Sequence, residues 1–183
     1  MFTLPWSEEA KQKKAVAFVG ERMATTFTVF RGLGGPERLS LVVANPYLCG
    51  FIQGKLTILT LALVANGKLS KESANLVSGF VMMAALSKEA ALELSRGIKT
   101  HNNSGTAAYK QGQAHGQKLA QYTLGIKDPS QDPDFARAAA KAKEAEALDA
   151  AIFPEAVSPN DEFMSALLGL EILWFLDVLN SQE

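Results

Sequence analysis

Four ionisable side chains occupy positions in this sequence that could support chemistry: Lys55, Glu171, Asp177 and His115. The lysine and the two acids each interrupt a strongly apolar stretch, and a helical period of about 100° per residue places them among apolar neighbours. A charge buried alone is strongly unfavourable, so such groups pair with an opposite charge, shift their pKa or reach water. These residues are therefore the first candidates for a site.

Two alternatives account for Lys55, Glu171 and Asp177. In the first, the ammonium group meets one of the carboxylates in a buried polar centre that could bind a ligand or act in acid–base chemistry. In the second, Lys55 extends its ammonium to water from a boundary position, and the two acids lie near a helix end or edge. Structural ion pairs produce the same pattern as functional ones, so the structural interpretation is favoured.

The histidines and the single cysteine give no metal-binding pattern. His115 lies at the margin of a helix face made of small residues, and His101 lies in a polar loop predicted over residues 99–105. Neither has a second ligand at helical metal-binding spacing. Cys49 lacks the spaced histidine and acid of a catalytic thiol, so we expect a buried structural thiol. The sequence predicts no metal and no cofactor.

The elements that position these residues are all predicted to be helices. Residues 46–65 follow the cap-and-proline pair Asn45-Pro46, and residues 159–180 follow a similar signal at Ser158-Pro159. Both segments are apolar almost all the way round, which is typical of helices buried on most sides. Lys55 belongs to the first of these segments, and Glu171 and Asp177 belong to the second.

The remaining helices are bounded by serine or aspartate caps and by glycine turns. No stretch alternates with a period of two residues for long enough to predict a strand. The sequence therefore predicts an all-α fold, a single domain over residues 1–183 with about eight helices, of which 46–65 and 159–180 are central. The other helices with clear bounds are predicted near residues 8–31, 71–86, 88–98, 106–124 and 133–152.

Small residues recur every four positions in two of the predicted helices. Such a stripe forms a groove into which another helix can press closely, a pattern best documented in membrane proteins. We therefore expect the two stripes to pack against each other. The residues are Gly50 and Gly54 on the central helix, and Ala108, Gly112, Gly116 and Ala120 on the helix 106–124.

The composition excludes several classes of function. The chain has 18 basic and 19 acidic side chains and a net charge of −1, so no strong field attracts nucleic acid or an anionic membrane. The apolar stretches 51–65 and 163–179 are shorter than the ~20 residues of a membrane span and contain charges. With one cysteine and no signal-peptide pattern, the sequence predicts a soluble, cytoplasmic protein with no membrane span.

These observations favour a non-enzymatic helical module that binds another protein, with self-association into a homo-oligomer as one form of that binding. The reason is that two helices are apolar all round, whereas a single buried central position needs only one such helix. The alternative is a helical bundle that binds a small apolar or anionic amphipathic ligand, whose head group would meet Lys55. Catalysis comes third, because no nucleophile or acid–base motif is present.

The predicted ion pair of Lys55 with Glu171 or Asp177 can be tested by a double-mutant cycle. Removal of one partner strands the other charge in the core, so Lys55→Met or Glu171→Leu alone should lower the free energy of unfolding by about 3–5 kcal/mol. The double variant should recover much of this loss, as measured by chemical denaturation. If each single substitution changes the free energy by less than about 0.5 kcal/mol, these side chains lie on the surface.

Overall fold

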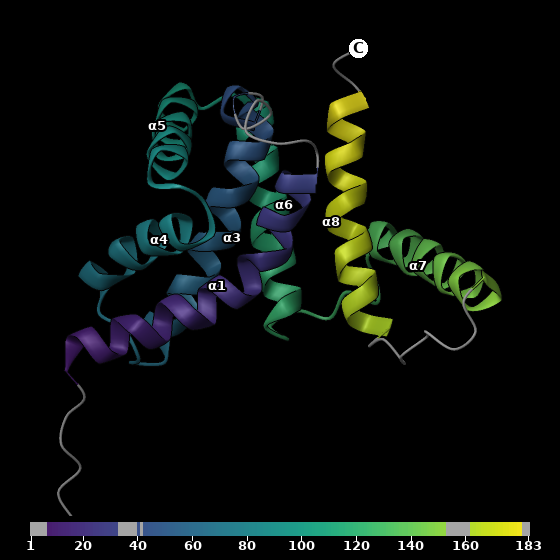
Figure 1. Ribbon diagram of the computed structural model, residues 1–183, viewed down its shortest axis with the longest axis horizontal. Coiled ribbons are helices and arrows are strands. Elements are labelled where there is room, and N and C mark those ends of the chain that lie inside the picture. Colours follow the sequence, from purple (N-terminus) through teal and green to yellow (C-terminus); the bar gives the residue numbers. More distant parts are fainter. Residues whose placement is uncertain (1–6, 33–39, 41, 153–161, 181–183) are drawn as a thin grey trace, which may run out of the picture. The chain divides into compact units, whose positions relative to one another are not determined.

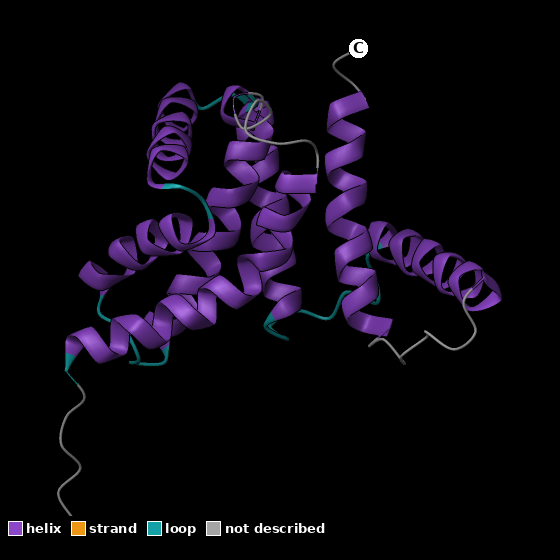
Figure 2. Cartoon of the chain, viewed as in Figure 1, coloured by secondary structure: helices purple, strands orange, loops and turns teal. Residues whose placement is uncertain are grey.

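The computed structural model describes residues 7–32, 40, 42–152 and 162–180 (Figure 1). Within these residues the regular secondary structure is helical and no strand is present (Figure 2), which confirms the predicted all-α fold class. The chain divides into two compact units, residues 1–120 and residues 121–183, and the boundary lies inside a helix. Folding as a single domain stays a prediction.

The first unit is built around one apolar helix. This helix, α3, contacts α1, α4 and α5, and its own residues supply much of the buried apolar core. The helices of the unit are α1 (Glu8–Gly32), α3 (Pro46–Ala65), α4 (Lys71–Ala85), α5 (Lys88–Ser104) and most of α6 (Ala107–Thr123).

Helix α3 has the bounds that the sequence predicts. The Oδ1 atom of Asn45 accepts a hydrogen bond from the backbone N–H of Leu48 at 3.1 Å, and Pro46 occupies the first turn, where its missing N–H costs nothing. Of the helices that the structure describes, α3 alone is long and apolar enough to cross a membrane. In its most apolar window 61% of the residues are buried, as in the core helix of a soluble protein.

Glycines on α3 allow the backbone of α6 to approach directly. A Cβ atom added to Gly50 would overlap the carbonyl oxygen of Tyr109, and one added to Gly54 would overlap that of Gln113. Any larger side chain at these positions would therefore force the two helices apart. The small-residue stripe on α3 faces α6.

The glycines of α6 make the reciprocal contact. A Cβ atom added to Gly112 would overlap the carbonyl oxygen of Tyr47, and one added to Gly116 would overlap that of Phe51. Ala120, the last member of the stripe, is fully buried. Both helices thus use small residues at a spacing of four, so the contact runs along successive turns of each.

Helix α5 is longer than the sequence predicts. Ser87 caps its N-terminus as predicted, with Oγ accepting the N–H of Ala90. The predicted polar loop over residues 99–105 is wrong, because the helix continues to Ser104 and ends at Gly105, which has a φ of 58°. The inner face of α5 is therefore about one turn longer than predicted. His101 follows the buried Ile98 at helical spacing, and its ring hydrogen-bonds to the carbonyl oxygen of Val43.

The second unit contains the end of α6, α7 (Pro133–Ile152) and α8 (Glu162–Asn180), and α7 packs along α8. Helix α7 has the predicted bounds, and the predicted first residues of the last helix, 159–161, lie outside the described residues. The α7–α8 contact suits small side chains, because Ala138 is buried on α7 and Gly169 of α8 approaches its backbone. The buried apolar residues of α8 include Ala166, Leu167, Leu170, Leu173, Trp174 and Phe175.

Because α3 and α6 are in close contact, a larger side chain at one of their glycines should destabilise the fold strongly. Gly112→Leu or Gly116→Leu should lower the free energy of unfolding by about 3 kcal/mol, because each new side chain must displace backbone atoms of α3. Chemical denaturation measures this loss. Gly20→Leu is the matched control, because a Cβ at Gly20 of α1 meets no atom of the described residues within 4 Å. Equal denaturation midpoints for the wild type and the α6 variants would contradict the contact.

Candidate functional site

Lys55 is buried in the first unit with a polar partner. Its side chain is on α3, it is 2% exposed, and its Nζ donates a hydrogen bond to Oγ1 of Thr26 on α1 at 2.7 Å. Thr26 is itself fully buried. Lys55 therefore does not extend to water from a boundary position, and the unit holds the amino group of a lysine inside its core.

The two acids of the last helix have different environments. Glu171 is 1% exposed. The side chain of Asp177 is 58% exposed, and its carboxylate forms an ion pair with Arg137 of α7 at 3.3 Å. Asp177 thus lies at the surface, as the structural interpretation predicts, and has no place in a buried centre. Lys55 belongs to the first unit and Glu171 to the second, so their pairing stays a prediction.

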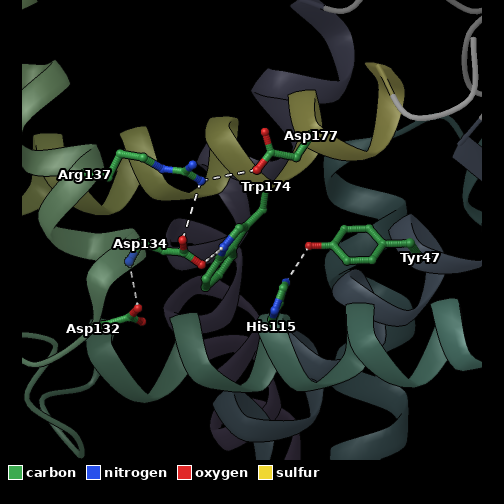
Figure 3. A network of polar contacts seen from close by, with 7 residues as sticks. All are labelled: Tyr47, His115, Asp132, Asp134, Arg137, Trp174 and Asp177. Carbon is green, nitrogen blue, oxygen red and sulfur yellow. Dashed lines mark hydrogen bonds and ion pairs between the residues drawn. The ribbon is translucent and has the colours of Figure 1, made fainter.

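His115 forms a hydrogen bond within the first unit. Its Nδ1 lies 2.8 Å from the hydroxyl oxygen of Tyr47, and the two rings meet edge to face with centroids 5.8 Å apart (Figure 3). The tyrosine hydroxyl donates when Nδ1 carries no proton. This bond ties the first turn of α3 to α6 beside the Gly112 contact, so the geometry assigns His115 a role in holding two helices together.

The segment before α3 is held by His101 and Cys49. The carbonyl oxygen of Val43 can only accept, so Nε2 of His101 donates to it at 2.9 Å, which fixes the ring tautomer. The Cys49 thiol is fully buried and lies 3.5 Å from the carbonyl oxygens of Val42 and Val43. Burial raises the pKa of the Cys49 thiol to about 12, so it stays a protonated donor, as expected of a structural thiol.

The second unit contains a buried polar contact that the sequence does not predict. The hydroxyl of Tyr122, near the end of α6, donates to Oδ2 of Asp132 at 2.8 Å, and both residues are buried. The other carboxylate oxygen caps α7 by accepting the N–H of Asp134 at 3.0 Å. The Asp-Pro pair indicates the cap, but only the folded chain brings Tyr122 to it across the intervening loop.

A second polar contact connects α7 with α8. Oδ2 of Asp134 accepts the indole N–H of Trp174 at 2.9 Å, and Arg137 lies between Asp134 and Asp177, 3.5 and 3.3 Å from their carboxylates (Figure 3). The arginine and its two acids are half exposed, so the ion pairs contribute little to stability. The buried indole with its hydrogen bond fixes the pairing of the helices more firmly.

An apolar cleft of about 430 Å³ lies between α7 and α8. The exposed ion pair of Lys143 and Glu162, 3.5 Å apart, lies at this cleft. The volume falls in the range of small-molecule sites, and Lys55 is not among the lining residues. In the described residues, no group of three or more histidine, cysteine or acidic side chains could hold a metal ion. The apolar lining includes Phe135, Ala139, Ala142, Phe163 and Ala166.

Two helices present apolar stripes to solvent. The α4 stripe consists of Leu76, Phe80 and Met83, which are 40–53% exposed, opposite a buried face that includes Val77 and Val81. The α8 stripe consists of Met164, Leu168 and Ile172, which are 37–51% exposed. Their spacings of three or four residues place each set on one helix face. These stripes are the candidate interaction surfaces.

The Tyr122–Asp132 contact predicts a pH dependence of stability. Burial raises the pKa of the Tyr122 phenol, and the hydrogen bond to Asp132 adds to the rise. The unfolded phenol loses its proton near pH ~10 while the native one keeps it, so the contribution is complete below about pH 10 and falls above it. Tyr122→Phe should make the decline above pH ~10 shallower, and should cost about 1–3 kcal/mol at neutral pH because Asp132 loses its donor.

Urea denaturation of both proteins over a pH series measures this difference. Cys49 also titrates at high pH, because burial raises its pKa to about 12, but it is present in both proteins. Its contribution therefore cancels in the comparison. Equal slopes above pH ~10 for the two proteins would contradict the prediction.

Comparison with known proteins gives no relative from which to assign a family: no family model, no curated protein and no solved structure matches this chain.

Proposed function

We propose that this protein is a non-enzymatic helical module that binds another protein through the α8 stripe. One observation carries the proposal: α8 is apolar on both of its faces, yet only one face is covered. The inner face is buried, while Met164, Leu168 and Ile172 remain 37–51% exposed. The comparably apolar α3 is instead enclosed by its neighbours, apart from positions such as Leu61.

The exposed face of α8 has the form of a helix-docking surface. Apolar residues at intervals of four make a ridge that fits between the side chains of a partner helix. The ridge includes Met164, and the flexible side chain of a methionine adapts to the shape of a partner. Covering these side chains removes apolar area from water, which favours association. The proposed partner is therefore a protein that presents the apolar face of a helix, in the cytoplasm that the sequence predicts.

A second candidate function is the binding of a small anionic amphipath near Lys55. The observation that favours it is a lysine side chain that is 2% exposed in an apolar core, with its Nζ 2.7 Å from the Thr26 hydroxyl. An anionic head group could be recognised there by charge and by the hydroxyl. Native mass spectrometry of the purified protein tests this candidate. A mass equal to that of the chain alone, after purification without detergent, would count against it.

The protein-binding proposal predicts that a charge in the α8 stripe weakens binding. Proteins that bind the immobilised chain are identified from a lysate of its source cells, and the candidate partner is purified. Leu168→Glu should then weaken the measured affinity by at least about thirtyfold, because a charge replaces an apolar anchor. Leu168 is half exposed, so the fold should be retained, which circular dichroism checks.

Leu92→Glu is the matched control because Leu92 is a similarly exposed leucine on α5, outside both stripes. This variant should bind the purified partner as the wild type does. Equal affinities for wild type and Leu168→Glu would show that the α8 stripe is not the binding surface. Equal loss in both variants would assign the effect to general surface charge.

A further inference from the structure

The cleft between α7 and α8 follows from the way in which these two helices cross. They approach each other closely where a Cβ atom added to Gly169 would lie 3.4 Å from the carbonyl oxygen of Ala138. Most of the cleft residues come after Ala138 on α7 and before Gly169 on α8. On this side of the crossing the helices diverge (Figure 1). The alanines at positions 139 and 142 are too small to fill the space that opens there.

The lining of the cleft is apolar and partly aromatic. On α7 it is formed by Phe135, Ala139 and Ala142, which share one helix face at intervals of four and three residues. Phe163 of α8 meets Phe135 with ring centroids 5.8 Å apart and 49° between the ring planes, and it stays 40% exposed. The alanines offer only methyl groups, so a flat ring can lie against them and contact Phe163.

The rim of the cleft carries one charge of each sign. Lys143 of α7 and Glu162 of α8 form an ion pair at 3.5 Å, and their side chains are 65% and 72% exposed. An anionic ligand would be attracted by the lysine and repelled by the neighbouring glutamate, and a cationic ligand would meet the reverse. The rim therefore gives no net attraction to a charged ligand. An uncharged ligand enters without the cost of removing a charge from water.

We propose that this cleft is a binding site for a small, uncharged aromatic molecule. Its ring system contacts the alanines of α7 and the exposed part of Phe163, where aromatic contact adds to the gain from covering apolar area. The hydroxyl of Ser165, which also lines the cleft, supplies a hydrogen-bonding group that orients the ligand. The volume of about 430 Å³ suits a ligand of this size.

This inference goes beyond the proposed function and does not depend on it. Met164, Leu168 and Ile172 of the α8 stripe do not line the cleft, and neither does Lys55. The ligand also differs in chemistry from the anionic amphipath considered at Lys55, because it carries no charge. Each proposal can therefore fail while the others stand.

Phenylnaphthylamine, an uncharged probe that fluoresces in apolar sites, tests binding to the full chain. Ala142→Leu should weaken its affinity by at least about tenfold, because the leucine side chain fills the space that the ring occupies. Ala140→Leu is the matched control, since Ala140 is exposed on α7 and does not line the cleft. Circular dichroism should show the helix content of the wild type in both variants.

Anilinonaphthalenesulfonate, which has the same rings with an added sulfonate, tests the role of the rim. The wild type should bind this anion more weakly than the uncharged probe. Glu162→Gln should tighten binding of the anion about threefold, because Lys143 loses its paired acid, and should leave the uncharged probe unchanged. Asp177→Asn is the matched control, because Asp177 is another exposed acid of α8 that does not line the cleft.

The following results would overturn the inference. A wild-type chain that does not raise the fluorescence of the uncharged probe has no such site. Equal weakening by Ala142→Leu and Ala140→Leu places the probe elsewhere, as does its release by Leu168→Glu. Tighter binding of the anion than of the uncharged probe, or an equal gain in Glu162→Gln and Asp177→Asn, shows that the rim does not select uncharged ligands. Loss of the purified protein partner in Ala142→Leu, but not in Ala140→Leu, assigns the cleft to that partner instead.

Discussion

The direct backbone contact between α3 and α6 is the constraint on which the first unit depends. Glycines on both helices let carbonyl oxygens of one helix lie where the Cβ atoms of the other would be. At this separation, side chains at the edges of the contact can also meet, as Tyr47 and His115 do with a 2.8 Å hydrogen bond. The apolar length of α3 then serves as the surface on which α1, α4 and α5 pack.

Three polar contacts within the protein join specific partners. Lys55 meets Thr26, His101 meets the carbonyl of Val43, and Tyr122 meets Asp132. Each contact joins segments that are separated in the sequence, and each would leave a buried polar atom with fewer partners if the segments shifted. These hydrogen bonds therefore specify which helix faces pack together, in addition to the apolar contacts that drive burial.

The surface, by contrast, carries apolar side chains that remain exposed to water, in the stripes on α4 and α8. On α4 the exposed residues share the helix with a buried face that includes Val77 and Val81. On α8 the inner face is buried, whereas Met164, Leu168 and Ile172 stay exposed. Exposed apolar area of this kind is typical of surfaces that bind other proteins.

The sequence by itself determined the helices, since caps, prolines and apolar periodicity are local signals. It predicted the bounds of α3 and α7 and the all-α class, and it failed at residues 99–104, whose inner face depends on a distant carbonyl at Val43. The spacing of small residues predicted stripes on two helices and their packing against each other, and the close contact of α3 with α6 confirms this. Only the tertiary structure showed that Glu171 is buried, whereas Asp177 lies at the surface and pairs with Arg137. Helical periodicity gives the face on which a residue lies, whereas burial depends on which neighbour covers that face.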